Sequence, residues 1–541
     1  MQKLILLLLT ISTVFVACSD EAGKDKQAKK ELLPRDRSIT AANAYSDLFL
    51  DSNAVEAFIR EQQLNDTLAD GLRNFYNYRN YQYAWFASDG LTEQALGFRN
   101  LYDYNKDSST NRKTLDKQLE ALTLEDDLRV AANDAGTRKT ELLLTWRFLN
   151  YLGDTYNSDK KRIAALQQLV PVKKYSIPDL VKRDKEEDDG ATEAYHRMQQ
   201  RVAELNEQQQ KGGWPAIPAP KKSWKKGSRE AGIVLLKKRL QAAGLSTGKD
   251  TSASYTDELE PAVKQAQTSF GLKADGIITP ALVKALNVPL EQRMEQVLVN
   301  MERMRWMPAE PQGKLLLVNI PAFTLYAQEG NQPAFAMDIV VGKEGHSTVM
   351  FTGQLNQVVF SPYWNLPSSI VRKEVLPHIE KDKGYLAKND MEVVGEEGGV
   401  PKIRQRPGNQ NQLGKVKFLF PNSYNIYFHD TPFKELFNKD NRAYSHGCIR
   451  LREPAKLAQY LLQDQPQWTP TAIDSAMNSG KEKFVKVSNP VPVLIYYYTA
   501  WVDDNNQLQF RDDIYGHDKK MASKLLLQNS AAQPLAMHSD R

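Results

Sequence analysis

The chain has 541 residues, with 71 lysines and arginines against 66 aspartates and glutamates and a net charge of +5. This length is too great for one hydrophobic core and predicts three or four domains. The nearly balanced charge, with no uniformly basic face, argues against a nucleic-acid partner. The two cysteines, Cys18 and Cys448, provide no disulfide framework of the kind that stabilises small secreted domains.

The N-terminus has the pattern of an export signal. A charged start and a short apolar run lead to Phe15-Val16-Ala17-Cys18, and the run is too short to predict a membrane span. The segment resembles a bacterial lipoprotein box, which implies a signal peptide over residues 1–17 and a lipid on Cys18. A plain signal peptide cut near Ala17 is the alternative. Residues 18–40 are polar and charged, and predict a solvated, lipidated tether.

Residues 41–225 predict a mainly helical scaffold domain. Apolar residues recur at helical spacing, and Glu141–Leu152 is apolar on most sides, as expected of a central buried helix. The charge run that ends at Asp188-Asp189-Gly190 predicts a solvated loop or helix end. Gly212–Pro220 marks a linker. No residue of this region proposes chemistry by itself.

Residues 226–290 predict a compact unit of three short helices. Two apolar helical faces end at Gly244 and Gly271, and Thr279-Pro280 predicts the start of the third helix. The order Phe-Gly-Leu, Asp-Gly, Thr-Pro and Ala-Leu-Asn in this unit resembles a peptidoglycan-binding domain. That resemblance implies docking to the wall polymer, and a structural spacer is the alternative. Residues 291–312 predict a connecting helix, whose methionines are expected to pack rather than to bind a cofactor.

From residue 313 to 505 the apolar period changes to that of strands, and predicts a mostly β domain. Strands are expected at Leu315–Pro321, Phe323–Tyr326, Phe335–Lys343, Gln357–Pro362, Val416–Phe420 and Tyr424–His429. The strand pattern stops over an insertion at about 372–413, which predicts a lid or recognition loop, with a disordered surface loop as the alternative. The tyrosine run 496–498 is expected in the core, and residues 506–541 are expected to form a tail.

One motif in the β domain carries the features of an activated thiol. His429 is followed sixteen residues later by Ser445-His446-Gly447-Cys448-Ile449-Arg450. A cysteine attacks as its thiolate and needs a base or a positive environment. His429 and His446 are the candidate bases, and Arg450 and Arg452 add positive potential. Gly447 lets the backbone approach a substrate, and amides at this turn are candidate oxyanion donors.

The motif has two other interpretations. Cys448 could be a small buried hydrophobe. A zinc site from His429, His446 and Cys448 would lack a fourth ligand and the paired cysteine spacing of structural zinc. We therefore expect no metal and no organic cofactor.

The motif resembles that of the L,D-transpeptidase (YkuD-like) family, in which a histidine precedes Ser/Thr-His-Gly-Cys and then Asn or Arg. The resemblance implies that Cys448 is the nucleophile and His429 its general base. It also implies that His446, Gly447 and Ser445 shape the turn and the oxyanion site. Substrate contacts are expected from Ser445, Arg450, Tyr427, Tyr363 and Trp364. Many members have serine or glycine where this chain has Asp430, and the role of Asp430 is left open.

Further residues resemble the large YcbB-like branch of the family. They are Tyr83–Phe86 with Gly90–Thr92, Met304–Pro308, and Arg404–Gly408. The branch implies a multidomain α+β fold with a helical scaffold, a peptidoglycan-binding unit and a β catalytic domain whose insertion caps the substrate groove.

The resemblance also implies a function. The expected activity is acyl transfer between peptidoglycan stem peptides, with 3-3 cross-links as product. The implied setting is a periplasmic, membrane-anchored lipoprotein whose partners are stem peptides and glycan, and the family makes a carbapenem adduct on Cys448 an expectation. The alternatives are an L,D-carboxypeptidase or a wall-protein-detaching hydrolase of the same fold, and a non-catalytic wall-binding lipoprotein.

Overall fold

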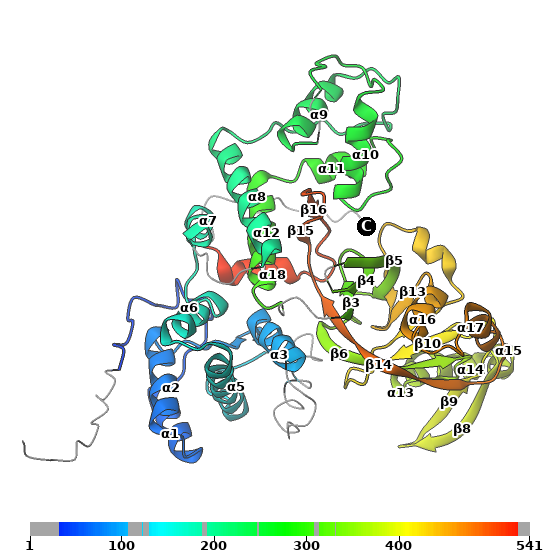
Figure 1. Ribbon diagram of the computed structural model, residues 1–541, viewed down its shortest axis with the longest axis horizontal. Coiled ribbons are helices and arrows are strands. Elements are labelled where there is room, and N and C mark those ends of the chain that lie inside the picture. Colours follow the sequence, from blue (N-terminus) through cyan, green and yellow to red (C-terminus); the bar gives the residue numbers. More distant parts are fainter. Residues whose placement is uncertain are drawn as a thin grey trace, which may run out of the picture.

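The computed structural model describes residues 32–105, 119, 122, 129–186, 192–245, 248–307, 313–330 and 332–527. The predicted signal peptide and Cys18 lie outside these residues. None of the described helices is both long and apolar enough to cross a membrane. Figure 1 shows helices on one side of the molecule, a small helical unit at one end and a strand-rich body on the other side. The predicted multidomain α+β fold is confirmed.

The N-terminal helices form a scaffold around an aromatic core. They are α1 (Ser52–Glu61), α2 (Asp66–Tyr78), α3 (Glu93–Asn105), α5 (Ala135–Thr155) and α6 (Asp159–Leu169), with the short strands β1 (Phe86–Ala87) and β2 (Gly90–Leu91). Trp85 packs against Phe98 and Phe148, with ring centroids 5.5 and 5.3 Å away. Glu141 is buried in α5 and accepts hydrogen bonds from the N–H groups of Ala84 and Trp85. The predicted central buried helix is therefore confirmed.

A second apolar cluster joins the scaffold to the β body. It contains residues of α7 (Ile177–Glu186), α8 (Glu193–Gln210), α12 (Leu290–Met304), the strand pair β15 (Ala500–Val502) and β16 (Leu508–Phe510), and α18 (His517–Leu525). Met521, Ala522 and Leu525 are buried in this cluster. The prediction of a tail from residue 506 was therefore wrong up to residue 527, because this helical face is covered by α12.

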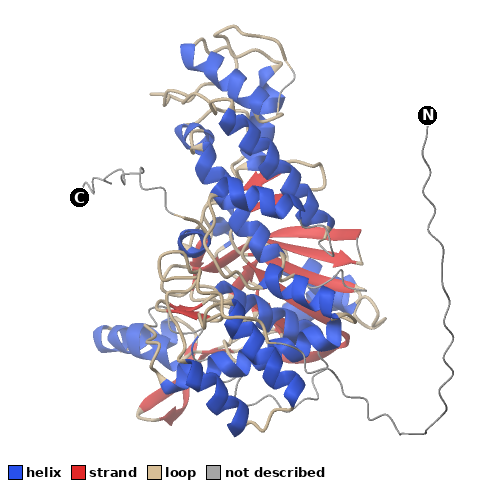
Figure 2. Cartoon of the chain, turned by 90° about the vertical axis from the view of Figure 1, so that its left-hand side faces the viewer, coloured by secondary structure: helices blue, strands red, loops and turns tan. Residues whose placement is uncertain are grey.

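The small unit at one end of the molecule contains α9 (Ala231–Ala242), α10 (Leu259–Ser269) and α11 (Pro280–Leu286). Figure 2 shows it projecting beyond the strands. Its own core includes Leu236, Val263 and Leu282. Thr279 caps α11 by accepting from the N–H of Leu282, with Pro280 at the helix start as predicted.

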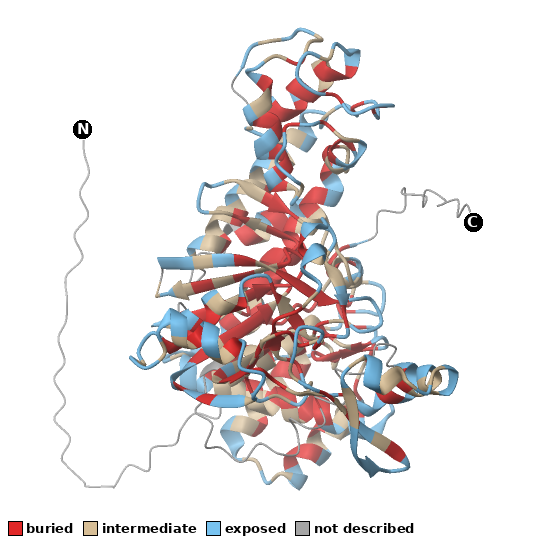
Figure 3. Ribbon diagram, turned by 90° about the vertical axis from the view of Figure 1, so that its right-hand side faces the viewer, coloured by how far each residue is buried: buried red, intermediate tan, exposed pale blue. Residues whose placement is uncertain are grey.

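The β body is a closed sheet. Its strands are β3 (Lys314–Asn319), β4 (Thr324–Glu329), β5 (Gln332–Gly342), β6 (Phe351–Phe360), β10 (Val416–Leu419), β11 (Phe428–His429), β12 (Ala443–Ser445), β13 (Ile449–Leu451) and β14 (Lys483–Tyr496). They follow the order β12-β5-β13-β11-β10-β6-β14-β3-β4, and β4 also pairs with β5, which closes the sheet. Figure 3 shows the buried residues concentrated inside it. The helices α16 (Pro454–Leu462) and α17 (Pro470–Met477) pack against this core, and Tyr497 is buried in it as predicted.

The insertion forms a separate cap rather than a loop. Its sheet contains β7 (Trp364–Asn365), β9 (Val400–Gln405) and β8 (Met391–Glu397) in that order. The helices α13 (Ser368–Ile370), α14 (Leu376–Lys381) and α15 (Tyr385–Lys388) complete it, with a π-helical turn at Val371–Val375. The expectation that the strand pattern stops here was wrong. Charged residues and the Gly398-Gly399 turn hide the alternation of an exposed hairpin.

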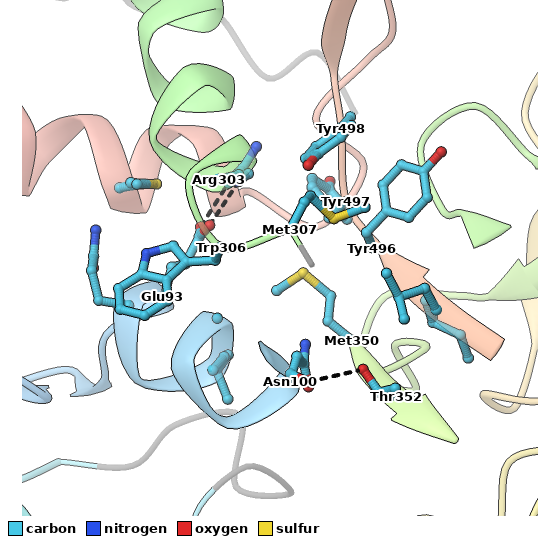
Figure 4. Close-up of a pocket in the computed structure, with 16 residues that line it drawn as sticks. Glu93, Asn100, Arg303, Trp306, Met307, Met350, Thr352, Tyr496, Tyr497 and Tyr498 are labelled. Atoms are coloured by element: carbon cyan, nitrogen blue, oxygen red, sulfur yellow. Dashed lines mark hydrogen bonds and ion pairs between the residues drawn. The ribbon is translucent and has the colours of Figure 1, made fainter. Parts of the chain in front are cut away.

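A cavity of about 60 Å³ lies where the scaffold meets the closed sheet. Figure 4 shows Trp306, Met350 and Tyr497 around it, with an ion pair between Glu93 and Arg303 on one side. Glu93 comes from the scaffold and Arg303 from α12, and both are largely buried. The scaffold is thus joined to the β body through buried apolar and ionic contacts.

Candidate active site

His429 is the last residue of β11, and Cys448 directly precedes the neighbouring parallel strand β13. Phe428 of β11 pairs with Ile449 of β13, and His429 pairs with Arg450. Both residues therefore lie at a strand pair inside the sheet and not at its edge. The predicted strand over Tyr424–His429 is also shorter, because the chain turns through Asn425 at φ 55° and pairs only from Phe428.

The nucleophile turn, Ser445 to Cys448, is closed by its own hydrogen bonds. The Ser445 hydroxyl donates to the Cys448 carbonyl at 2.5 Å and accepts from the Gly447 N–H at 3.2 Å. Gly447 has φ 106°, a conformation that favours glycine. Cys448 lies in the loop directly before β13.

The Cys448 thiol is held in its neutral form. Sγ donates to the Asn425 carbonyl at 3.5 Å. Burial raises the thiol pKa to about 11, although hydrogen bonds from the Tyr427 N–H and hydroxyl and the charge of Arg450 act in the opposite direction. Cys448 keeps part of its surface accessible. The resting group is therefore a reachable thiol and not a preformed thiolate.

His429 is buried and oriented by the backbone that follows it. Its Nδ1 lies 2.5 Å from the Asp430 carbonyl. Because a carbonyl only accepts, Nδ1 must carry the proton and Nε2 has a free lone pair. Burial, with the charge of Arg450, lowers the His429 pKa to about 3, so the ring is neutral at pH 7. No hydrogen bond joins His429 to Cys448 among the described residues, as is common before substrate binds.

The side chain of Asp430 bonds to neighbouring residues and not to His429. Its carboxylate accepts from the Lys415 N–H at 2.9 Å and from Lys434 Nζ at 2.6 Å. The side chain therefore holds neighbouring backbone, while its carbonyl orients His429. Successive side chains along an extended chain point to opposite faces, which explains why the Asp430 carboxylate and the His429 ring have different partners.

Arg450 follows the nucleophile on β13 and lies over the Phe433 ring at 5.8 Å. Its Nε is buried without a hydrogen-bond partner among the described residues. Burial lowers its pKa, and the charges of Cys448 and Glu435 act in the opposite direction. A guanidinium with an unpartnered donor beside the nucleophile can bind an anionic or carbonyl group of a substrate.

The His446 side chain contacts the cap. Its Nε2 lies 3.0 Å from the Glu374 carboxylate, and its ring centroid lies 4.8 Å from that of His346. The described residues contain no cluster of three or more metal-ligating side chains. The arrangement therefore does not bring His446 together with His429 and Cys448 as a zinc site requires.

Two predicted substrate residues lie at the base of the cap. Arg404 covers the Tyr363 ring at 4.2 Å, and the Tyr363 carbonyl accepts from Lys417 Nζ. Trp364 packs against the apolar core of the cap. Their substrate contacts remain predictions.

Sequence reasoning missed Glu374 and Thr348. Thr348 donates to the Gly447 carbonyl at 2.8 Å, whereas Glu374 reaches His446 from the cap. Neither residue lies in a motif. Their contacts with the nucleophile turn form only when distant parts of the chain fold together.

Comparison with known proteins places three family models on the chain. Residues 70–206 match a scaffold domain and 229–286 a peptidoglycan binding domain. Residues 313–493 match the L,D-transpeptidase catalytic domain known as YkuD. The chain contains an L,D-transpeptidase catalytic domain. The three regions occur in the order that the resemblance to the YcbB-like branch predicts, and they confirm that resemblance.

A curated relative from Haemophilus influenzae bears an L,D-transpeptidase name and is 30% identical over 243 residues. The match covers 42% of this chain, and the chain spans about half, 49%, of the relative's length.

Among solved structures, the chain is similar to an L,D-transpeptidase from Mycobacterium smegmatis. The identity is 15% and the TM-score 0.20, with 34% of this chain and 58% of that chain covered. An L,D-transpeptidase from Stackebrandtia nassauensis matches at 12% identity and a TM-score of 0.22, over 52% and 96% of the two chains. The assignment of the L,D-transpeptidase domain depends on the family models and not on these low scores.

Proposed function

We propose that this chain is a peptidoglycan L,D-transpeptidase that forms 3-3 cross-links through an acyl-enzyme on Cys448. One observation carries the proposal. His429 is the last residue of β11, Cys448 directly precedes the neighbouring parallel strand β13, and the imidazole is neutral with Nε2 available as a base. Such a pair supports acyl transfer by general base catalysis.

In the proposed first step, Cys448 Sγ attacks the carbonyl carbon of the third stem residue, diaminopimelate in the family. The thiol proton passes to His429 Nε2 as the sulfur–carbon bond forms, because both groups are neutral before the reaction. The oxyanion collapses, the bond to the terminal D-Ala breaks, and His429 returns the proton to the leaving amine.

In the second step, an amine from another stem attacks the thioester and the Cys448 thiol leaves. The product is a 3-3 cross-link. Water in place of the amine would release a tripeptide, which is the carboxypeptidase alternative. We propose that Arg450 Nε donates a hydrogen bond to the stem peptide that acylates Cys448, because this Nε has no partner among the described residues.

The test is mass spectrometry of muropeptides after incubation of disaccharide tetrapeptides with the full chain or its Cys448→Ala variant. We expect a Cys448-dependent dimer with one tetrapeptide and one tripeptide stem. Tripeptide alone would move the assignment to a carboxypeptidase. Intact substrate, with Cys448→Ala still retained on purified sacculi, would favour the wall-binding protein.

We further propose a periplasmic lipoprotein anchored through Cys18, and a carbapenem adduct on Cys448. The support is the sequence pattern at Phe15–Cys18 and the thiol of the candidate site. Incorporation of a labelled fatty acid that is lost in Cys18→Ala tests the anchor. A mass increase of the intact protein after carbapenem treatment, lost in Cys448→Ala, tests the adduct.

A further inference from the structure

The peptide bond between Gly447 and Cys448 is held from one side only. The Gly447 carbonyl accepts from the Thr348 hydroxyl at 2.8 Å. The Gly447 N–H is used within the turn, where it donates to Ser445. Within the described part of the chain, the N–H of Cys448 has no hydrogen-bond partner. This N–H belongs to the same peptide bond as the carbonyl that Thr348 holds.

Because the peptide bond is planar, the contact of Thr348 with the Gly447 carbonyl also affects the Cys448 N–H. In a trans peptide the C=O and the N–H point in opposite directions. A bond that fixes the Gly447 carbonyl therefore also fixes the direction of the Cys448 N–H. Because the attacking sulfur belongs to the same residue, the oxygen of an attacked carbonyl comes close to that N–H. Preorganised donors at such a position stabilise the developing oxyanion.

Thr348 is itself held at both its polar groups. The Gly342 N–H donates to its Oγ1 at 2.9 Å, which leaves the hydroxyl proton for the Gly447 carbonyl. The Thr348 N–H donates to the Tyr515 hydroxyl at 3.3 Å, and that hydroxyl donates to the Gly342 carbonyl at 2.5 Å. A Cβ on Gly342 would lie 2.1 Å from the His346 carbonyl oxygen, so the loop closes only over glycine. Tyr515 thus bridges the two ends of the loop that supports the nucleophile turn.

Tyr515 comes from the C-terminal segment, beyond the matched catalytic domain at 313–493. Its N–H donates to the Tyr497 hydroxyl at 2.9 Å, and the Tyr497 hydroxyl donates to Asp513 at 2.8 Å. Its ring also stacks on Tyr497, with centroids 5.7 Å apart. The segment that follows the closed sheet therefore returns to support the loop behind the nucleophile.

We propose that Thr348 and Tyr515 are positioning residues that aim the Cys448 N–H at the oxyanion formed during acyl transfer. The inference rests on the proposed function. As the sulfur–carbon bond forms, the carbonyl π electrons move to oxygen, and the Cys448 N–H donates to that oxygen. When the bond to the leaving amine breaks, the electrons return and the contact weakens. Thr348 and Tyr515 touch neither the substrate nor the sulfur in this scheme.

The first test is Thr348→Val in the full chain, assayed for acyl transfer and for alkylation of Cys448 by iodoacetamide. Alkylation needs the sulfur but forms no oxyanion. We expect kcat for acyl transfer to fall by about 10- to 100-fold, as for other losses of precise positioning. KM and the alkylation rate are expected to stay within about twofold, because the sulfur and the substrate contacts remain. Thr348→Ser keeps the hydroxyl and is expected to restore most of kcat.

The second test is Tyr515→Phe, which keeps the ring packing and removes only the hydroxyl. We expect a smaller fall in kcat, about 3- to 10-fold, because Tyr515 acts through Thr348. Tyr460→Phe is the matched control, since its hydroxyl also donates to a backbone carbonyl, that of Gln328, at 2.9 Å in the same domain. The control is expected to keep full kcat.

Equal kcat in wild type and Thr348→Val would overturn the inference. So would a parallel loss of acyl transfer and alkylation, or a Thr348→Ser variant as slow as Thr348→Val. All rates are compared with a wild type that forms Cys448-dependent product. Failure of the proposed function is a separate result, in which wild type itself leaves the stem peptides unchanged.

Discussion

The nucleophile turn and the cap are held in different ways. Ser445 and Gly447 are bonded within the turn, and Thr348 holds it from the adjacent loop. The cap has a small apolar core of its own, with Val371 and Ile403 buried in it. Among the described residues, Glu374 of the cap contacts His446 of the turn, with its carboxylate 3.0 Å from Nε2.

This difference suits the turn to the chemical step and the cap to controlling access to the site. Precise chemistry needs groups fixed by several bonds, as in the turn. Elements with few buried contacts open locally at low free energy, as expected of lids. We infer that the turn is built to stay in place and the cap to move.

The largest expected effect comes from removing the reacting atom. Cys448→Ala should lower cross-link formation by at least about 10³-fold, because the acyl-enzyme has no sulfur. Mass spectrometry of the dimer measures it. Thermal unfolding should change little, since the side chain is partly exposed. A residual rate within tenfold of wild type would place the nucleophile elsewhere.

The ionisation of the thiol tests how the turn prepares its nucleophile. The Cys448 pKa of about 11, against about 8.5 for an unperturbed thiol, predicts about 300-fold less thiolate at neutral pH. Because the thiolate fraction rises with pH until the pKa is passed, the alkylation rate should climb from pH 7 to about 11. Thiolate absorbance at 240 nm should follow it. A plateau already at pH 6 would contradict the prediction and indicate a thiolate–imidazolium pair.

A valine-to-alanine substitution made once in the cap and once in the closed sheet compares the stability of the two. Val371→Ala in the cap core should cost about 2 kcal/mol and raise hydrogen exchange across residues 364–405 by about 30-fold. Exchange at 445–448 should not change. Val493→Ala in β14, equally buried, should instead lower the stability of the whole sheet. If Val371→Ala raised hydrogen exchange by the same factor in the cap and in the turn, the two would unfold as one unit.

The smallest expected effect comes from the contact between Glu374 of the cap and His446 of the turn. Glu374→Gln should lower the ratio of cross-linked to hydrolysed product by about 2- to 5-fold, because a looser cap admits water. The total turnover should stay within twofold. Glu392→Gln is the matched control, since among the described residues Glu392 pairs with Arg404 and Arg406 inside the cap. An unchanged product ratio in Glu374→Gln would argue against a role for this contact.

Local patterns were sufficient for much of the architecture. The scaffold, the three-helix unit and the β domain each follow from hydrophobic period, and the helix start at Pro280 from turn chemistry. The cap hairpin was missed because both faces of β8 are largely exposed, which removes the alternation that marks a strand. The folded C-terminal segment was missed because its apolar face is short and needs α12 to cover it.

For the candidate site, the sequence by itself determined the residue types and their spacing. His429, Ser445, Gly447 and Cys448 lie within one short stretch, so their chemistry is visible as a motif. Only the tertiary structure decided what surrounds them. The neutral state of the thiol and imidazole comes from burial, the partner of His446 comes from the cap, and the support of Gly447 comes through Thr348 and Tyr515. These depend on contacts between residues far apart in the chain, which no local pattern encodes.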